Sequence, residues 1–156
     1  MNKYNSYKYV YPPTARTQEQ LDIMMRDEAD GIDPLAPDVI DQEKQKILFS
    51  GEYWFAAENR FPREGSEKHL LIIAKVPMYS MDDITPEAWA DLFVVWKKLV
   101  TEENLEGGGF CLRFGNPEKS GASLKRLHVN VIMPKKDEKV RFPIGGRAEL
   151  KEGLHL

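Results

Sequence analysis

Residues 120–134, with the sequence SGASLKRLHVNVIMP, decide how this chain folds and where its chemistry lies. From Arg126 onward polar and apolar residues alternate, which is typical of a β-strand. Arg126, His128 and Asn130 therefore share one face of the strand, spaced about 7 Å apart. The apolar residues between them, which we expect to pack in the core, are Leu127, Val129 and Val131.

The polar row suits a bound phosphate group. The guanidinium of Arg126 neutralises charge and donates two parallel hydrogen bonds, and the amide of Asn130 donates another. A neutral imidazole at His128 is able to attack phosphorus as a nucleophile. The alternative is a solvent-facing strand with ordinary polar residues, and the spacing alone leaves both interpretations open.

The charge of the chain is unevenly distributed. The chain has 156 residues and a net charge of −3, which argues against general nucleic-acid binding. Residues 113–141 nevertheless hold eight Lys and Arg against three Asp and Glu, whereas residues 1–46 hold six against nine. A local basic segment in a mildly acidic protein indicates a bound anion, although a solvated loop surface explains the same pattern.

The flanking sequence predicts an α+β fold: an antiparallel sheet of about five strands with helices packed on one face. Thr85, Pro86 and Glu87 have the composition of a helix start. The apolar residues of this helix, which recur at spacings of three and four, are Trp89, Leu92, Phe93, Trp96 and Leu99. The expected strands are 47–49, 53–57, 69–75, 110–114 and 126–133, with a final one at 140–142.

Two domains are expected, an N-terminal extension at residues 1–45 and the main domain at residues 46–156. The extension should contain one helix, from a capping box at Thr17–Gln20 to about Asp30, and turn-forming residues at 31–37 end it. Nothing in residues 1–46 resembles catalytic chemistry, so we expect the extension to pack on the main domain.

Composition excludes several classes of protein. The single cysteine, Cys111, rules out an internal disulfide and fits a cytoplasmic location. The apolar runs are far shorter than the ~20 residues that a membrane span needs. Three histidines without paired spacing or neighbouring cysteines predict no metal site.

Residues 126–132 resemble the signature of the histidine triad (HIT) family, in which three histidines alternate with apolar residues after a glycine-rich loop. The loop corresponds to residues 121–125. Upstream segments at 55–60, 68–77 and 83–93 resemble the first half of the family in the correct order, so the similarity covers roughly residues 46–136.

The resemblance implies a nucleotide phosphohydrolase or nucleotidyl transferase that acts on a nucleoside 5′-phosphoanhydride or phosphoramidate. His128 holds the middle position, which in the family attacks the α-phosphate and forms a covalent nucleotidyl-histidine. Asn59 and His69 correspond to nucleoside-binding positions, although Lys68 replaces the usual glycine before His69. The phosphate-binding residues implied are Arg126, Asn130, Ser123, Arg113 and Asn116.

The triad itself is altered, because Arg126 and Asn130 replace its first and third histidines. Arginine binds phosphate but does not act as an acid near neutrality. The alternative is therefore a catalytically weak or inactive nucleotide-binding or interaction protein. The resemblance also implies a homodimer, and no cofactor beyond a divalent cation that accompanies a polyphosphate substrate. Neither a nucleic-acid nor a membrane partner is expected.

Overall fold

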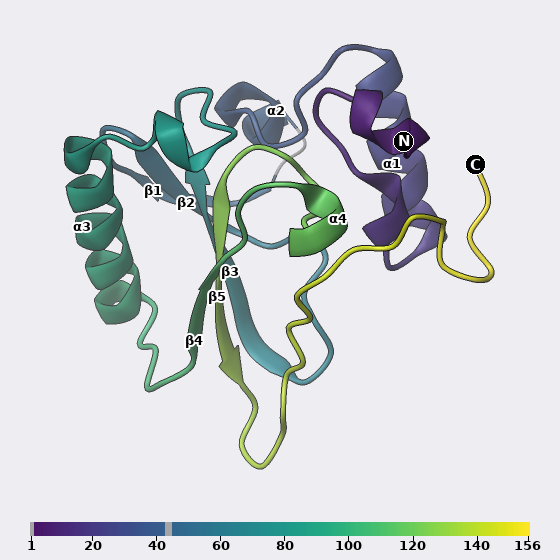
Figure 1. Cartoon of the computed structure of the whole chain (residues 1–156). Coiled ribbons are helices and arrows are strands. Elements are labelled where there is room, and N and C mark those ends of the chain that lie inside the picture. Colours follow the sequence, from purple (N-terminus) through teal and green to yellow (C-terminus); the bar gives the residue numbers. More distant parts are fainter. Residues whose placement is uncertain (1, 43–44) are drawn as a thin grey trace.

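Five antiparallel strands form one open sheet at the centre of the structure, a computed structural model that describes residues 2–42 and 45–156 (Figure 1). Their spatial order is β1-β2-β3-β5-β4. The strands are β1 (Ile47–Ser50), β2 (Trp54–Glu58), β3 (Ser66–Ala74), β4 (Gly109–Leu112) and β5 (His128–Pro134). The predicted α+β class and the antiparallel sheet are confirmed.

The prediction of a strand at residues 140–142 is wrong. These residues form no strand. The physical reason is that β5 is already paired on both sides, with β3 and with β4, so the chain that leaves β5 finds no free strand edge beside it. Phe142 instead places its ring against two arginine side chains.

One face of the sheet packs against α3 (Pro86–Glu102). The helix begins as predicted, because the Thr85 hydroxyl accepts a hydrogen bond from the amide of Ala88 at 3.1 Å. Its buried residues are Ala88, Leu92, Val95 and Leu99, which pack on Trp54, Ile72 and Val129 of the sheet. The face of α3 that packs on the sheet therefore differs from the predicted one. Trp89 and Phe93 point outward and are 51% and 55% exposed.

The opposite face of the sheet is covered by the N-terminal extension (Figure 1). The extension contains the predicted helix α1 (Gln18–Ala29) and a short second helix, α2 (Pro37–Gln42), that the sequence did not predict. Leu35 and Ile40 of the extension pack on Phe55 and Leu71 of the sheet. Both faces of β2 and β3 are consequently buried, and the extension packs on the main domain as expected.

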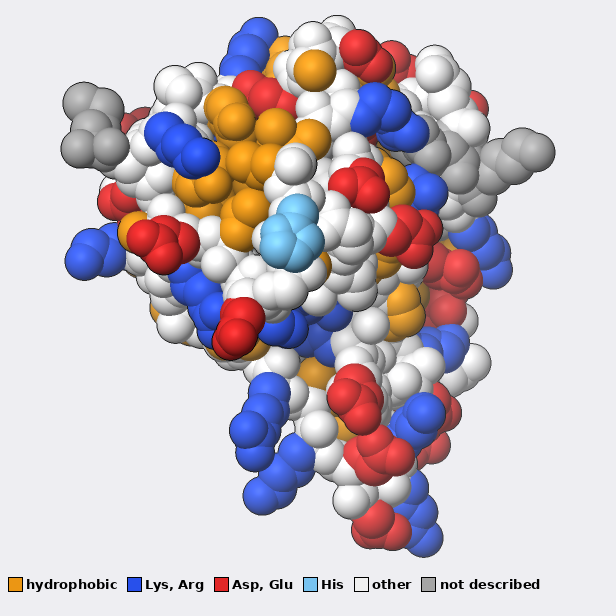
Figure 2. Space-filling view, turned by 90° about the vertical axis from the view of Figure 1, so that its right-hand side faces the viewer, with side chains coloured by type: hydrophobic (Ala, Val, Ile, Leu, Met, Phe, Trp, Pro, Cys, Tyr) orange, Lys and Arg blue, Asp and Glu red, His pale blue; other side chains and the backbone are white. Residues whose placement is uncertain are grey.

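Both ends of the chain lie beside α1 (Figure 1). Residues 9–11 hydrogen-bond to the backbone of Ser123 and Lys125 at 2.7 and 2.8 Å, and the Tyr11 hydroxyl donates to the carbonyl of Arg147. On this side of the molecule, charged side chains of both signs surround a patch of hydrophobic ones (Figure 2). The short helices not yet mentioned are η1 (Lys3–Ser6), η2 (Pro12–Thr14), η3 (Met81–Asp83) and α4 (Pro117–Ser120).

Within residues 2–42 and 45–156 no helix combines the length and the apolar character that crossing a membrane requires.

Candidate functional site

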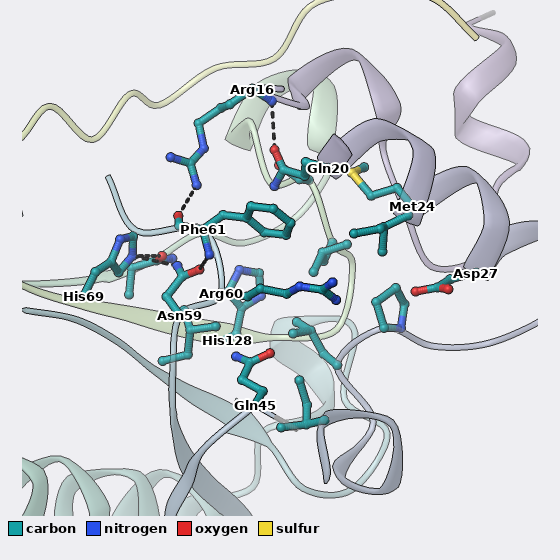
Figure 3. A pocket seen from close by; sticks show the side chains of 18 of the residues that line it. Arg16, Gln20, Met24, Asp27, Gln45, Asn59, Arg60, Phe61, His69 and His128 are labelled. Carbon is teal, nitrogen blue, oxygen red and sulfur yellow. Dashed lines mark hydrogen bonds between the residues drawn. The ribbon is translucent and has the colours of Figure 1, made fainter. Parts of the chain in front are cut away.

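His128 is the first residue of β5 and lines a cavity between the sheet and the extension (Figure 3). Its Nδ1–H donates to the backbone carbonyl of Arg126 at 2.8 Å. This hydrogen bond fixes the tautomer that leaves the lone pair on Nε2, and no group in the described part of the chain hydrogen-bonds to that nitrogen. Burial lowers the pKa of His128, the hydrogen bond to Arg126 opposes this, and the charge of Arg113 lowers it further. The imidazole is therefore neutral near pH 7 and has a nucleophilic lone pair.

Arg126 precedes β5 and does not line the cavity that His128 and Asn130 line, although it borders the adjoining groove with His128. Its guanidinium is buried, and it donates to Oδ2 of Asp33 at 2.8 Å and to the carbonyl of Ala74 at 2.9 Å. The Tyr79 hydroxyl donates to the same carboxylate oxygen at 2.6 Å. The predicted row of three polar side chains is thus divided, because the Arg126 side chain is bonded to the extension whereas His128 and Asn130 face the cavity.

Asn130 is held by a chain of hydrogen bonds. The amide N–H of Arg63 donates to Nδ1 of His69 at 3.0 Å, so the proton of this imidazole is on Nε2. That nitrogen lies 2.8 Å from Oδ1 of Asn130 and donates to it. The Asn130 amide is thereby oriented with its NH₂ group free of partners among residues 2–42 and 45–156. Burial lowers the pKa of His69 to about 4, which keeps the ring neutral.

Asn59 lies beside His69 at the end of β2. Its Oδ1 accepts from the amide of Phe61 at 2.8 Å, and its Nδ2 is 3.0 Å from Nε2 of His69. Both residues line the cavity, together with Asn130 and His128. The structure therefore brings four of the predicted residues, one directly after β2 and the others on β3 and β5, around one space.

Two other predicted residues, Ser123 and Arg113, also line this cavity, whereas Asn116 does not. The Ser123 hydroxyl accepts from Thr14 at 3.1 Å. Asn116 instead caps α4 by accepting from the amide of Glu118 at 3.0 Å, and it lines an adjoining groove that His128 also borders.

One end of the cavity is polar, and the other is largely apolar but includes the carboxylate of Asp27. Arg16 and His69 lie to one side of His128, and Met24 and Asp27 lie to the other (Figure 3). The apolar lining comes mainly from the extension and consists of Ile23, Met24, Pro34, Leu35, Val39, Ile40, Phe61, Leu71 and Leu124. An apolar pocket with a few converging polar groups is the usual form of a small-molecule site. Among the residues that the structure describes, no cluster of three His, Cys, Asp or Glu side chains is able to hold a metal ion.

Comparison with known proteins identifies the family. Residues 41–137 match the sequence model described as the HIT domain. The chain belongs to the HIT domain family. A bis(5′-adenosyl)-triphosphatase from Dictyostelium discoideum is 26% identical to it over 95 residues, which are 60% of this chain and 62% of that protein. The chain thus matches less than two thirds of the length of this relative.

Solved structures show the same HIT fold. A histidine triad nucleotide-binding protein from Candida albicans aligns with a TM-score of 0.53 and 24% identity, covering 72% of this chain and 82% of the other. A second structure, described as a HIT-like protein, aligns with a TM-score of 0.53 and 19% identity over 62% and 94% of the two chains. The predicted family and its fold are therefore confirmed.

Several residues at the cavity lie outside the matched HIT segment and were missed by the sequence analysis. Arg16 and the apolar residues of α1 belong to the extension, and Asp33, which binds Arg126, does so too. Arg63 lies within the segment and was also missed. No local pattern marks these residues, because their partners are distant in sequence. The only feature of the sequence that distinguished the extension was its excess of acidic residues.

Proposed function

We propose that this HIT protein is a nucleotide phosphohydrolase or nucleotidyl transferase that uses His128 as its nucleophile. Nε2 of His128 attacks the α-phosphorus of a nucleoside 5′-phosphoanhydride or phosphoramidate. The new N–P bond forms as the bond from phosphorus to the leaving group breaks, and the leaving group departs with the electron pair. Water or another acceptor then attacks the same phosphorus and restores the imidazole.

The geometry of His128 is the observation that carries this proposal. A nucleophilic imidazole needs a free lone pair, a fixed tautomer and access to the substrate. The hydrogen bond from Nδ1 to the Arg126 carbonyl supplies the first two, and the position of the ring at the cavity supplies the third. The distant bis(5′-adenosyl)-triphosphatase relative supports the same class of chemistry.

The neighbouring side chains support the proposal, because they could bind the rest of a nucleotide. In this proposal the free NH₂ group of Asn130 donates to an oxygen of the α-phosphate, and Asn59 binds the ribose. The apolar end of the cavity, which includes Met24, Leu35 and Ile40, suits a nucleobase because its ring stacks against hydrocarbon.

Turnover of diadenosine triphosphate and of adenosine 5′-phosphoramidate tests the proposal. We expect the His128→Ala variant to lose about 10⁴-fold or more in rate, as is typical when a nucleophile is removed. The control is His155→Ala, because that histidine is exposed near the end of the chain and should leave the rate unchanged. Equal and negligible rates for wild type and His128→Ala would contradict the enzyme proposal.

A second candidate, a nucleotide-binding protein without catalysis, is favoured by one observation. Arg126 forms an ion pair with Asp33, and Asn130 carries no titratable proton. Neither residue therefore replaces a triad histidine as an acid. Calorimetry separates the candidates: binding of AMP with no turnover of either substrate supports the second candidate. A covalent adduct on His128 excludes it.

We also propose that the protein forms a homodimer, and sedimentation velocity tests this.

A further inference from the structure

Three arginines, Arg16, Arg63 and Arg113, line the polar end of the cavity. They come from three separate places in the chain: the residues before α1, the loop between β2 and β3, and the loop after β4. Within residues 2–42 and 45–156, no carboxylate lies within ion-pair distance of any of them. The cluster therefore presents three positive charges without a counterion.

The protein satisfies these guanidinium groups only in part. Arg16 donates to the carbonyl of Phe61, and Arg113 donates to the carbonyl of Pro143. Arg63 and Arg113 both stack on the ring of Phe142, with their Cζ atoms 4.9 and 4.0 Å from its centroid. The Nε atoms of these last two arginines are buried and have no hydrogen-bond partner in the described chain. An unpaired buried donor is costly unless a ligand satisfies it.

The electrostatics of the three arginines also indicate that a ligand binds there. Burial lowers the pKa of all three arginines, and the positive charge of Arg63 lowers the pKa of Arg16 and Arg113 further, the latter to about 10. All three remain protonated at neutral pH. Like charges that are kept together at the end of a cavity favour the binding of an anion there.

Among the described residues, none of the three side chains closest to the triad positions is able to protonate a leaving group. Arg126 does not deprotonate near neutrality, and Asn130 has no titratable proton. His69 is neutral, with its only ring proton donated to Asn130. An amine leaving group needs a proton to depart, whereas a phosphate leaves as an anion and needs only positive charge to stabilise it.

We propose that Arg16, Arg63 and Arg113 form a second phosphate subsite beside His128, and that the substrate is a nucleoside with two or more linked phosphates. This inference rests on the proposed function and chooses between the two substrate classes left open there. When Nε2 of His128 bonds to the α-phosphorus, the bond from that phosphorus to the bridging oxygen breaks. The bridging oxygen keeps the electron pair and leaves on the β-phosphate, whose added negative charge the three arginines neutralise.

Calorimetry with ligands that lack a cleavable bond between an α- and a β-phosphate of a nucleoside tests the subsite directly. The ligands are AMP, adenosine 5′-(α,β-methylene)diphosphate and inorganic pyrophosphate, each titrated into the full chain. We expect the methylene diphosphate to bind about tenfold or more tightly than AMP, because its second phosphate gains charged hydrogen bonds. Arg16→Gln and Arg63→Gln should each remove most of this advantage and leave the affinity for AMP within about threefold.

The matched control is Arg141→Gln, which removes one positive charge from an exposed side chain and should preserve the advantage. If AMP and the methylene diphosphate bind equally well, the subsite is wrong and the proposed function stands. If pyrophosphate binds and is lost in Arg16→Gln while AMP does not bind, the subsite stands and the proposed function fails. Binding of none of the three ligands would overturn both.

Discussion

The buried guanidinium of Arg126 binds the carboxylate of Asp33 at 2.8 Å, which connects the strand of the candidate nucleophile to the N-terminal extension. The two side chains are only 5% and 9% exposed. Because the carbonyl of Arg126 also holds the ring of His128, this ion pair fixes the backbone that orients the imidazole. The extension is therefore part of the site and not an appendage to it.

Breaking this pair should be costly. We expect Asp33→Ala to lower the free energy of unfolding by about 3–5 kcal/mol, because it leaves the Arg126 charge buried and unpaired. Urea unfolding measures this, with the exposed Asp41→Ala as control. The double variant Asp33→Leu, Arg126→Met should recover much of the loss, since it removes both charges together. A stability for Asp33→Ala equal to that of the control would show that the pair contributes nothing.

The lowered pKa of His69 predicts that the folded chain loses stability as the pH falls. Its pKa is about 4 in the folded chain against 6.5 for the free side chain, so between these values the unfolded state binds more protons. Stability then falls as the pH is lowered from 6.5 towards 4, by up to about 3 kcal/mol. Chemical denaturation across this range should show the slope in wild type and in His155→Ala, and a shallower slope in His69→Asn. An unchanged slope in His69→Asn would refute the assignment.

The third prediction concerns Gly121, which lies in the loop before β5 and close to the backbone of Gly145. Gly121 has φ of +76°, and a Cβ atom there would lie 2.2 Å from the carbonyl oxygen of Gly145. Gly121→Ala should therefore destabilise the chain by about 2 kcal/mol or more and reduce turnover. Gly31→Ala is the matched control, because its φ of +69° is similar and nothing lies within 4 Å of the new atom. Thermal unfolding that shifts equally in both variants would show that the contact with Gly145 is unimportant.

Local sequence patterns predicted the strands, α1 and α3 because each depends on nearby residues. Alternating hydrophobicity marks β5, and the Thr17 and Thr85 caps mark the helix starts. The exposed side of α3 was assigned incorrectly because Trp89 and Phe93 also fit the helical spacing, so the pattern alone did not determine which side faces the sheet.

The site was predictable only where its residues lie in the strand pattern or in the segments that resemble the HIT family. The strand pattern identified His128 and Asn130, the family resemblance added Asn59, His69, Ser123 and Arg113, and all six line one cavity. The contribution of the extension was not predictable. The contact of Asp33 with Arg126 spans 93 residues, and no periodic pattern encodes a contact of that range. Arg16 reaches the cavity for the same reason: a tertiary contact brings it there.

The most direct test of the central claim is mass spectrometry of the protein during turnover. The chain is mixed with diadenosine triphosphate, quenched within milliseconds in alkaline denaturant, in which a bond from phosphorus to imidazole nitrogen survives, and digested into peptides. We predict one adenylyl group on the peptide that contains His128, and none in the His128→Ala variant. Cleavage of the substrate by His128→Ala at the wild-type rate, with no adduct on any peptide, would contradict the account.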